Sequence, residues 1–197
     1  MTLPQGQHER QHERQNEKQN VGLLGAGTVG SALAQLIAER RDLGLKLSGA
    51  LVRDPGKPRH AALAGVISTR AEEVIASADV VVELLGGVGV PGDLMLTALE
   101  AGKPVVTANK AVLAERWREL KPYLERGLVH FEAAVLAGTP AIGPLAGVLR
   151  GSRPLELHAI LNGTCNYILS QLEAGAGYRE ALSEAQRLGY AEADPSL

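Results

Sequence analysis

Cysteine and aromatic residues are scarce in this sequence of 197 residues. The single cysteine, Cys165, excludes an intrachain disulfide framework and is typical of a protein from a reducing compartment. Aromatic residues make up 3% of the chain, too few for the stacking platforms that bind single-stranded nucleic acid. The chain also has no large excess of charge of one sign, because 20 lysine and arginine residues are balanced by 22 aspartate and glutamate residues. We therefore expect neither a nucleic-acid partner nor a membrane-surface partner.

Long hydrophobic runs are also missing. No apolar segment approaches the roughly 18 residues of a membrane-spanning helix, and no basic stretch followed by an apolar one opens the chain. A cytoplasmic protein is the resulting expectation. Glycine, in contrast, is abundant at 23 residues, which favours closely packed α/β layers. The length allows one domain and part of a second.

Residues 1–19 differ from the remainder of the chain. Gln7-His8-Glu9-Arg10 repeats at residues 11–14, and almost no apolar residue accompanies the repeat. Such a segment cannot bury enough surface to offset the entropy lost on ordering. His8 and His12 would chelate a metal only if the segment were helical. A disordered, low-complexity tail is the favoured interpretation.

From Asn20 onward, short apolar runs alternate with segments of helical periodicity. Strands are predicted at residues 21–24, 45–53, 66–68, 78–83, 104–107 and 128–132, and helices at 29–37, 71–76, 94–101 and 117–126. This alternation predicts an α/β domain over residues 20–139, built on a doubly wound parallel sheet with right-handed crossovers. After Pro140 we expect a partial α+β domain over residues 140–197. Its predicted elements are a helix at 142–150, a strand at 155–161 and helices at 166–173 and 179–188.

The loop Gly25-Ala26-Gly27-Thr28-Val29-Gly30 lies directly between the first strand and the first helix. This is the context that the dinucleotide fingerprint G-x-G-x-x-G requires. In that fingerprint Gly25 permits the tight turn, Gly27 lets the backbone approach the pyrophosphate, and Gly30 allows close packing of helix on strand. The free N–H groups at the helix start would face the phosphates. These six residues therefore predict a Rossmann-type dinucleotide site.

The end of the second strand bears on the choice of dinucleotide. The residue that contacts the adenosine ribose is expected about 20 residues past the loop, where Arg53 and Asp54 stand. Arg53 would face a 2′-phosphate, Asp54 would accept from a 2′-hydroxyl, and an exposed loop with solvated charges is the third interpretation. Because the basic residues Lys57 and Arg59 follow, NADP is favoured and NAD stays possible.

Two later strands end on the same edge of the predicted sheet. Glu83-Leu84-Leu85-Gly86-Gly87 follows one of them, and Gly86 and Gly87 would let the backbone pass close to a cofactor. Thr107-Ala108-Asn109-Lys110 follows the other. The position of Lys110 leaves two interpretations equally open. It is either a solvated charge at a helix start or an ammonium that bridges a cofactor and an anionic substrate.

The motifs occur in the order found in homoserine dehydrogenases, and residues 20–197 resemble that family. The segments that carry the resemblance are the glycine loop, Gly86-Gly87, residues 101–110, Phe131-Glu132-Ala133-Ala134-Val135, residues 161–169 and residues 189–195. The resemblance implies NAD(P)-dependent interconversion of L-homoserine and L-aspartate 4-semialdehyde, a step in threonine, isoleucine and methionine biosynthesis. The alternatives are a truncated NADP-binding module with weak or no turnover and a related amino-acid dehydrogenase. It implies a homodimer for the full-length protein. It also implies an Asp and a proton-transferring Lys beyond Leu197.

The resemblance further implies roles for individual residues. It places Lys110 beside the nicotinamide and the substrate, as a catalytic residue. It assigns Glu132, with the backbone of Val135, Ala137 and Thr139, to a site for a monovalent cation such as sodium, and oxygen ligands are those that a hard cation prefers. From position alone, Glu132 would be a strand-end carboxylate satisfied by nearby N–H groups.

The second domain holds the expected substrate residues. Asn162 and Thr164 are candidate caps of a helix whose free N–H groups would receive the substrate carboxylate or the cofactor's carboxamide. The resemblance implies that Glu192 binds the amino group of homoserine through a charge-assisted hydrogen bond. Cys165 has no histidine close in sequence to act as its base, so a packing role is favoured. His158, in an apolar strand, is also expected in the core.

Overall fold

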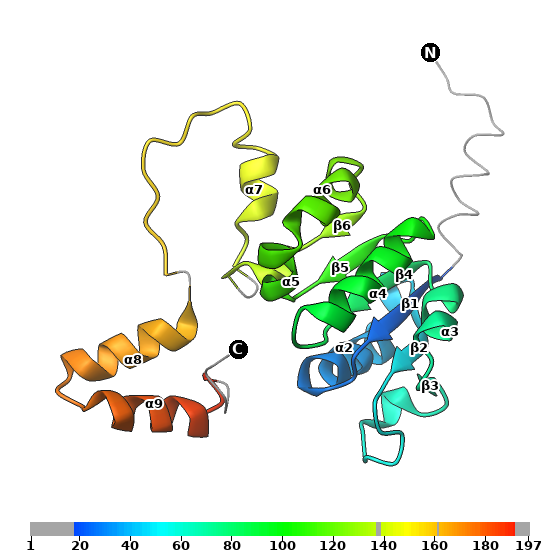
Figure 1. The fold of residues 1–197 in the computed structure, drawn as a ribbon, viewed down its shortest axis with the longest axis horizontal. Coiled ribbons are helices and arrows are strands. Elements are labelled where there is room, and N and C mark those ends of the chain that lie inside the picture. Colours follow the sequence, from blue (N-terminus) through cyan, green and yellow to red (C-terminus); the bar gives the residue numbers. More distant parts are fainter. Residues whose placement is uncertain (1–17, 137–138, 161, 192–197) are drawn as a thin grey trace. The chain divides into compact units, whose positions relative to one another are not determined.

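The computed structural model describes residues 18–136, 139–160 and 162–191 (Figure 1). The tail predicted for residues 1–19 therefore lies outside the described residues except for Lys18 and Gln19. The chain divides after Phe131 into two units, residues 1–131 and 132–197. No helix of the described ranges is long and apolar enough to cross a membrane.

The first unit is built around one sheet of six parallel strands in the order β3-β2-β1-β4-β5-β6. Its elements are β1 (Gln19–Leu24), α2 (Thr28–Glu39), η1 (Arg41–Leu43), β2 (Leu45–Leu51), η2 (Ala61–Leu63), β3 (Ile67–Ser68), α3 (Ala71–Ser77), β4 (Val80–Glu83), α4 (Gly89–Glu100), β5 (Val105–Thr107), α5 (Lys110–Glu115), α6 (Trp117–Glu125) and β6 (Val129–His130). This strand order is that of a doubly wound Rossmann sheet, which confirms the predicted fold class.

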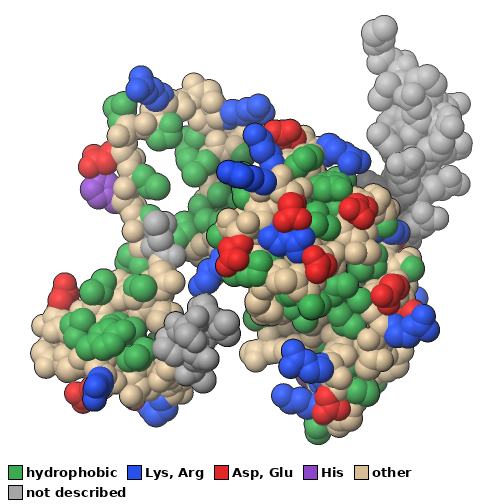
Figure 2. All heavy atoms as spheres, in the orientation of Figure 1, with side chains coloured by type: hydrophobic (Ala, Val, Ile, Leu, Met, Phe, Trp, Pro, Cys, Tyr) green, Lys and Arg blue, Asp and Glu red, His purple; other side chains and the backbone are tan. Residues whose placement is uncertain are grey.

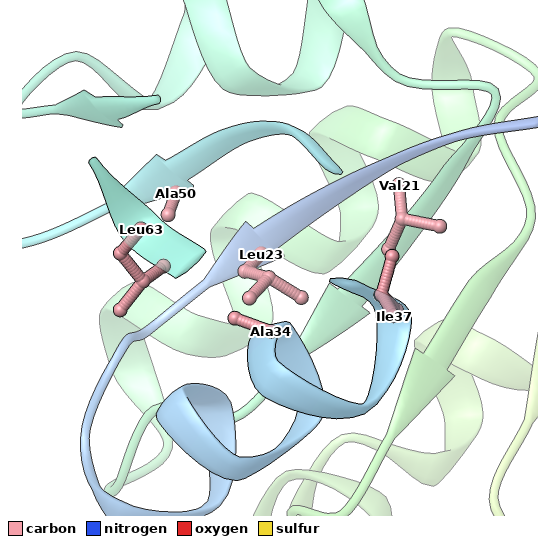
Figure 3. Close-up of a cluster of buried hydrophobic side chains, with 6 residues drawn as sticks. All are labelled: Val21, Leu23, Ala34, Ile37, Ala50 and Leu63. Carbon is pink, nitrogen blue, oxygen red and sulfur yellow. The ribbon is translucent and has the colours of Figure 1, made fainter. Parts of the chain in front are cut away.

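Alternating residues of β1 face helices on opposite sides of the sheet. The side chains of Val21 and Leu23 are buried against Ala34 and Ile37 of α2 (Figure 3). Gly22 faces the other way, because a Cβ atom placed there would lie 2.9 Å from the carbonyl oxygen of Val74 in α3. Successive strand residues point to opposite faces, so α2 and α3 cover the two faces of the sheet.

Several boundaries differ from those expected, most of them by one or two residues, and the larger differences concern α4 and β6. Helix α4 begins at Gly89 rather than near residue 94, with Pro91 in its first turn, where a missing N–H removes no helical hydrogen bond. The strand expected over 128–132 is reduced to β6. Glu132 then opens the short 3-10 turn η3 (Glu132–Ala134) instead of ending a strand.

The second unit is helical in its described part: α7 (Ile142–Ala146), α8 (Gly163–Glu173) and α9 (Tyr178–Arg187). The predicted helix at 142–150 is thus shorter than expected. The predicted strand at 155–161 is wrong for its described residues, 155–160, which pair with no strand. An isolated extended segment leaves its backbone groups unpaired, so it forms no strand without a neighbour.

Two side chains of this unit are more exposed than expected. His158 is not in a core, because its ring is 83% exposed and its Nε2 lies 2.7 Å from Glu156 Oε1. Cys165 is exposed as well, so the expected packing role is not found within the described residues. Hydrophobic side chains also lie at the surface of α8 and α9, where Leu169 and Tyr178 are both 59% exposed (Figure 2).

Candidate functional site

The candidate site of the first unit lies where the strand order reverses, between β1 and β4. Ligands of open parallel sheets bind at such a point, outside the carboxyl ends of the strands. The Gly25–Gly30 loop follows β1 there, and the segment Leu84–Gly87 follows β4. The two segments touch, because a Cβ atom on Gly25 would lie 3.0 Å from the Leu84 carbonyl oxygen.

The three glycines of the loop have three different surroundings. Gly25 has a φ of 109°, a conformation that favours glycine. A Cβ atom on Gly30 would overlap the carbonyl oxygen of Gly25, so the start of α2 fits against the loop only without a side chain. A Cβ atom on Gly27 would have no described atom within 4 Å. The loop is therefore tight at its ends and open at its centre.

The open centre of the loop leads into the amino end of α2. Gly27 is the N-cap of this helix, and no side chain of the described residues caps it. The first N–H groups of a helix have no acceptor within the helix, so these groups are available to an anion together with the positive end of the helix dipole. Beside Gly27 lie Ala26, which is half-buried, and Thr28 and Val29, which are exposed.

A buried carboxylate, that of Glu83, lies where the neighbouring strands β4 and β5 end. Glu83, the last residue of β4, has no exposed surface. Its Oε1 accepts the N–H of Leu85 over 2.7 Å, and its Oε2 accepts the hydroxyl of Thr107 over 2.6 Å. The hydroxyl oxygen of Thr107 in turn accepts the N–H of Asn109 over 2.9 Å. Burial raises the pKa of the Glu83 carboxyl, and the hydrogen bonds from Thr107, Leu85 and Asn109 offset part of that rise.

Sequence reasoning assigned no role to Glu83, Thr107 or Asn109. A signal was present, because two neighbouring apolar strands, Val80–Glu83 and Val105–Thr107, both end in a polar residue. In a buried parallel sheet such residues need a partner. The register of β4 and β5 places Glu83 directly opposite Thr107 and so provides that partner.

The other predicted residues of this edge are exposed. Gly86 and Gly87 lie at the surface after β4, and Gly87 has a φ of 86°. Lys110 is the first residue of α5 and is exposed as well. Within the described part of the chain no acidic group forms an ion pair with its ammonium. The structure thus brings Lys110 to the edge of the sheet that also carries the glycine loop.

The end of β2 presents basic groups. Val52 is buried and Arg53, the next residue, is exposed. The carboxylate of Asp54 accepts the N–H of Gly56 over 2.8 Å, so one of its oxygens closes the local turn. The guanidinium of Arg59 donates to the carbonyl of Lys57 over 2.8 Å. No such local bond is found for the side chains of Arg53 and Lys57 among the described residues, and Arg53 is the nearer of the two to β2.

Glu132 caps the start of α7 in the second unit. Its Oε1 accepts the N–H groups of Ala141 and Ile142 over 2.6 and 3.0 Å, and its Oε2 accepts that of Gly143 over 2.8 Å. The N–H groups of Ala141 and Gly143, followed by that of Ile142, lower the pKa of the Glu132 carboxyl. The interpretation from position alone, a carboxylate satisfied by nearby N–H groups, describes this geometry.

The remaining predicted cation ligands are only partly described. The N–H of Val135 donates to the carbonyl of Glu132 over 3.1 Å, and that of Thr139 to the carbonyl of Leu136 over 3.0 Å. Ala137 lies outside the described residues. No cluster of three or more His, Cys, Asp and Glu side chains suited to a metal is found in the ranges that the structure describes.

Two of the predicted substrate residues, Asn162 and Thr164, lie at the amino end of α8 in the second unit. Asn162 is the N-cap, and its Oδ1 accepts the N–H of Cys165 over 2.8 Å. The hydroxyl of Thr164 donates to the carbonyl of Tyr190, and the ring of Tyr190 lies 5.1 Å from that of Tyr167. The start of α8 thus holds the segment that leads toward Glu192, which itself lies outside the described residues.

The reversed strand order, the glycine loop at the reversal and the open amino end of α2 define a Rossmann-type domain of the kind that binds dinucleotides. Comparison with known families makes the assignment narrower. The family model for the NAD binding domain of homoserine dehydrogenase matches residues 25–132, and the model for homoserine dehydrogenase matches residues 140–197. The chain belongs to the homoserine dehydrogenase family.

Individual relatives agree with this assignment. The chain is 42% identical over 188 residues to the homoserine dehydrogenase of Corynebacterium glutamicum, a match that covers 89% of this chain and 42% of that protein. A homoserine dehydrogenase from Thiobacillus denitrificans superposes with a TM-score of 0.81 at 38% identity, over 91% of this chain and 44% of the other. A hyperthermophilic archaeal homoserine dehydrogenase in complex with NADPH has a TM-score of 0.74 at 29% identity, over 91% of this chain and 64% of the other. The chain spans less than half the length of the Corynebacterium glutamicum relative.

Proposed function

We propose that this chain provides the cofactor-binding part and a portion of the substrate-binding part of a homoserine dehydrogenase. Such an enzyme interconverts L-homoserine and L-aspartate 4-semialdehyde. The observation that carries the proposal is the glycine loop at the strand reversal, tight at Gly25 and Gly30 and open at Gly27, in a chain of this family. A cytoplasmic location, and a homodimer for the full-length protein, remain predictions.

The loop residues fit a dinucleotide. Gly27 leaves room where a side chain would stand, and the uncapped amides at the start of α2 supply donors for a pyrophosphate. The residues that would line this cradle are Gly25, Ala26, Gly27, Thr28, Val29 and Gly30. Gly86 and Gly87 would allow the cofactor to pass close to the backbone after β4.

NADP is the proposed form of the cofactor. Arg53 is exposed at the end of β2, and a guanidinium is well suited to a 2′-phosphate. Asp54, the candidate acceptor for a 2′-hydroxyl, already accepts the N–H of Gly56. The archaeal relative bound NADPH, which supports the same choice.

Lys110 is the proposed catalytic residue of this chain. When bound, the cofactor supplies the hydride that reduces the aldehyde of aspartate 4-semialdehyde to the alcohol of homoserine. The negative charge that develops on the aldehyde oxygen calls for a positioned cation or proton donor. Lys110 is exposed at the start of α5 and has no ion-pair partner in the described ranges. Its ammonium is therefore free to face that oxygen or an anionic group of the substrate.

The second unit would bind the ends of the amino-acid substrate. We assign the substrate carboxylate to the amino end of α8, beside Asn162 and Thr164, since the first amides of a helix attract anions. Glu192 would accept the substrate ammonium. The bond from Thr164 to Tyr190 supports this assignment, because it holds the chain two residues before Glu192 near the start of α8.

A monovalent cation such as sodium is proposed at Glu132 with the backbone of Val135, Ala137 and Thr139. The carboxylate fits such an ion, because its pKa is lowered and its Oε2 accepts one N–H against two at Oε1. An acceptor position is therefore left on Oε2. Carboxylate and carbonyl oxygens are suitable ligands for a hard cation.

The proposal is tested by two measurements on the purified chain. Titration with NADPH, followed by the fluorescence of the nicotinamide, should give saturable binding. Mixing with aspartate 4-semialdehyde should then consume NADPH and form homoserine, detected by chromatography. Saturable binding without homoserine would restrict the proposal to cofactor binding, and an absence of binding would refute it.

A further inference from the structure

The side chain of Asn109 joins two segments of the candidate site. Its Oδ1 accepts the N–H of Val112 over 3.2 Å and so caps α5. Its Nδ2 donates to the carbonyls of Leu85 and Gly87 over 3.0 and 2.9 Å. One buried amide thus connects the first turn of α5, which begins with Lys110, to the loop after β4.

Glu83 and Thr107 connect the same two segments through further hydrogen bonds. Glu83 accepts the N–H of Leu85 in the loop, and it accepts the hydroxyl of Thr107, whose oxygen accepts the backbone N–H of Asn109. A longer contact of 3.5 Å joins Asn109 Nδ2 to Glu83 Oε1. The polar side-chain atoms of these three residues therefore all have partners.

Such an arrangement is a costly way to stabilise a sheet edge. Replacing a buried polar network by apolar side chains is often neutral or stabilising, so its polar groups are better explained by what they hold in place. They hold a loop that has no ladder partner of its own and in which Gly87 has a φ of 86°. They also fix the backbone of Lys110, which follows Asn109 directly.

We propose that Asn109 and Glu83 are positioning residues of the dehydrogenase site, which keep the Leu85–Gly87 loop and the Lys110 backbone in one fixed arrangement for the cofactor. The inference rests on the proposed function. It adds residues that touch neither substrate nor cofactor and that act through the loop and through Lys110.

Asn109→Ser separates loop fixation from helix capping. Serine is a good N-cap, so α5 keeps an acceptor for Val112, whereas the two donors to Leu85 and Gly87 are lost. Asn20→Ser is the matched control at the start of β1, the opposite end of the sheet, where the asparagine Nδ2 donates to Asp79 over 3.0 Å. Both variants lose an amide donor, and only one of them is at the site.

Two measurements are made on each variant. The Kd for NADPH is measured well below the melting temperature, and amide hydrogen exchange is followed in the peptide that covers residues 84–89. We expect Asn109→Ser to weaken NADPH binding about tenfold and to speed exchange in that peptide about tenfold, a change of about 1.4 kcal/mol in each, because the loop loses both hydrogen bonds from the Asn109 amide. Asn20→Ser should change neither value.

A second pair of variants tests the part of the network that Thr107 forms with Glu83 and the backbone of Asn109. Thr107→Val removes the hydroxyl and should weaken NADPH binding, whereas Thr107→Ser keeps the hydroxyl and should bind as the unmodified chain does. Unchanged Kd or unchanged exchange in Asn109→Ser would overturn the inference, and so would equal binding by the valine and serine variants. If the unmodified chain fails to bind NADPH, the proposed function is overturned instead, and the inference falls with it.

Discussion

Alanine at Gly27 and alanine at Gly30 should separate cofactor binding from folding. The two glycines belong to one loop but differ in the space that a methyl group would find. At Gly30 the methyl group would overlap the Gly25 carbonyl oxygen, well inside the 3.0 Å that such atoms keep. At Gly27 no described atom lies within 4 Å of it.

The expected stabilities follow from these surroundings. Gly30→Ala gains about 1 kcal/mol of helix propensity but forces a backbone shift of the kind that costs about 1–3 kcal/mol or more. We therefore expect a net destabilisation of up to about 2 kcal/mol. Gly27→Ala loses up to about 1 kcal/mol as an N-cap and regains roughly 0.4–1 kcal/mol from a less flexible unfolded chain. Its stability should stay close to that of the unmodified chain.

NADPH binding should show the opposite contrast, with the larger loss in Gly27→Ala. The methyl group of Gly27→Ala would occupy the open side of the loop, where the pyrophosphate backbone is expected. We expect its NADPH Kd to rise at least tenfold while its urea midpoint changes little. Gly30→Ala should lower the midpoint and weaken binding only as far as the loop shifts. Normal NADPH binding by a folded Gly27→Ala variant would refute the placement of the pyrophosphate.

Three further predictions concern charged residues. Lys110→Ala should lower kcat roughly 100-fold and change stability by less than about 0.5 kcal/mol, because the side chain is exposed; an unchanged kcat would remove Lys110 from the mechanism. Arg53→Ala should weaken NADPH binding roughly tenfold or more, since a charge-assisted bond contributes about 1.5–3 kcal/mol, and should leave NADH binding unchanged; equal losses for both cofactors would contradict this role. Glu132→Gln should lower the Tm at neutral pH. The pKa of Glu132 is lowered in the folded protein. The stabilisation by its carboxylate is therefore fully present above the ordinary glutamate pKa of about 4.3, and it disappears as the pH falls through the lower pKa of Glu132 in the folded protein. The difference in Tm between this variant and the unmodified chain should therefore shrink in acid, and a difference independent of pH would contradict the cap.

Local patterns predicted the framework of the first unit. The apolar run before Gly25 and the helical periodicity after it were sufficient to place β1, the glycine loop and α2, because these elements follow from residues close in sequence. Short elements were less predictable. The strand expected at 128–132 proved to be two residues followed by a 3-10 turn, and the one expected at 155–161 pairs with no strand in its described part. An apolar run specifies a strand only where a neighbour accepts its backbone hydrogen bonds.

The residues of the candidate site also divide into those that local sequence patterns or the family resemblance predicted and those that only the structure revealed. Glycine spacing predicted the cofactor loop, and a family resemblance supplied the predictions for Lys110, Glu132 and Glu192. The network of Glu83, Thr107 and Asn109 in the first unit depends on pairing between residues far apart in sequence.

The sequence by itself determined the doubly wound fold, the glycine loop between β1 and α2 and the family, because these depend on periodicity, on glycine spacing and on the order of motifs. Only the tertiary structure decided that Glu83 is buried opposite Thr107, that Asn109 joins a loop to a helix, and that Glu132 caps α7. The physical reason is that a buried polar group is defined by its partners. Strand register and chain reversal, which no local pattern records, bring those partners together.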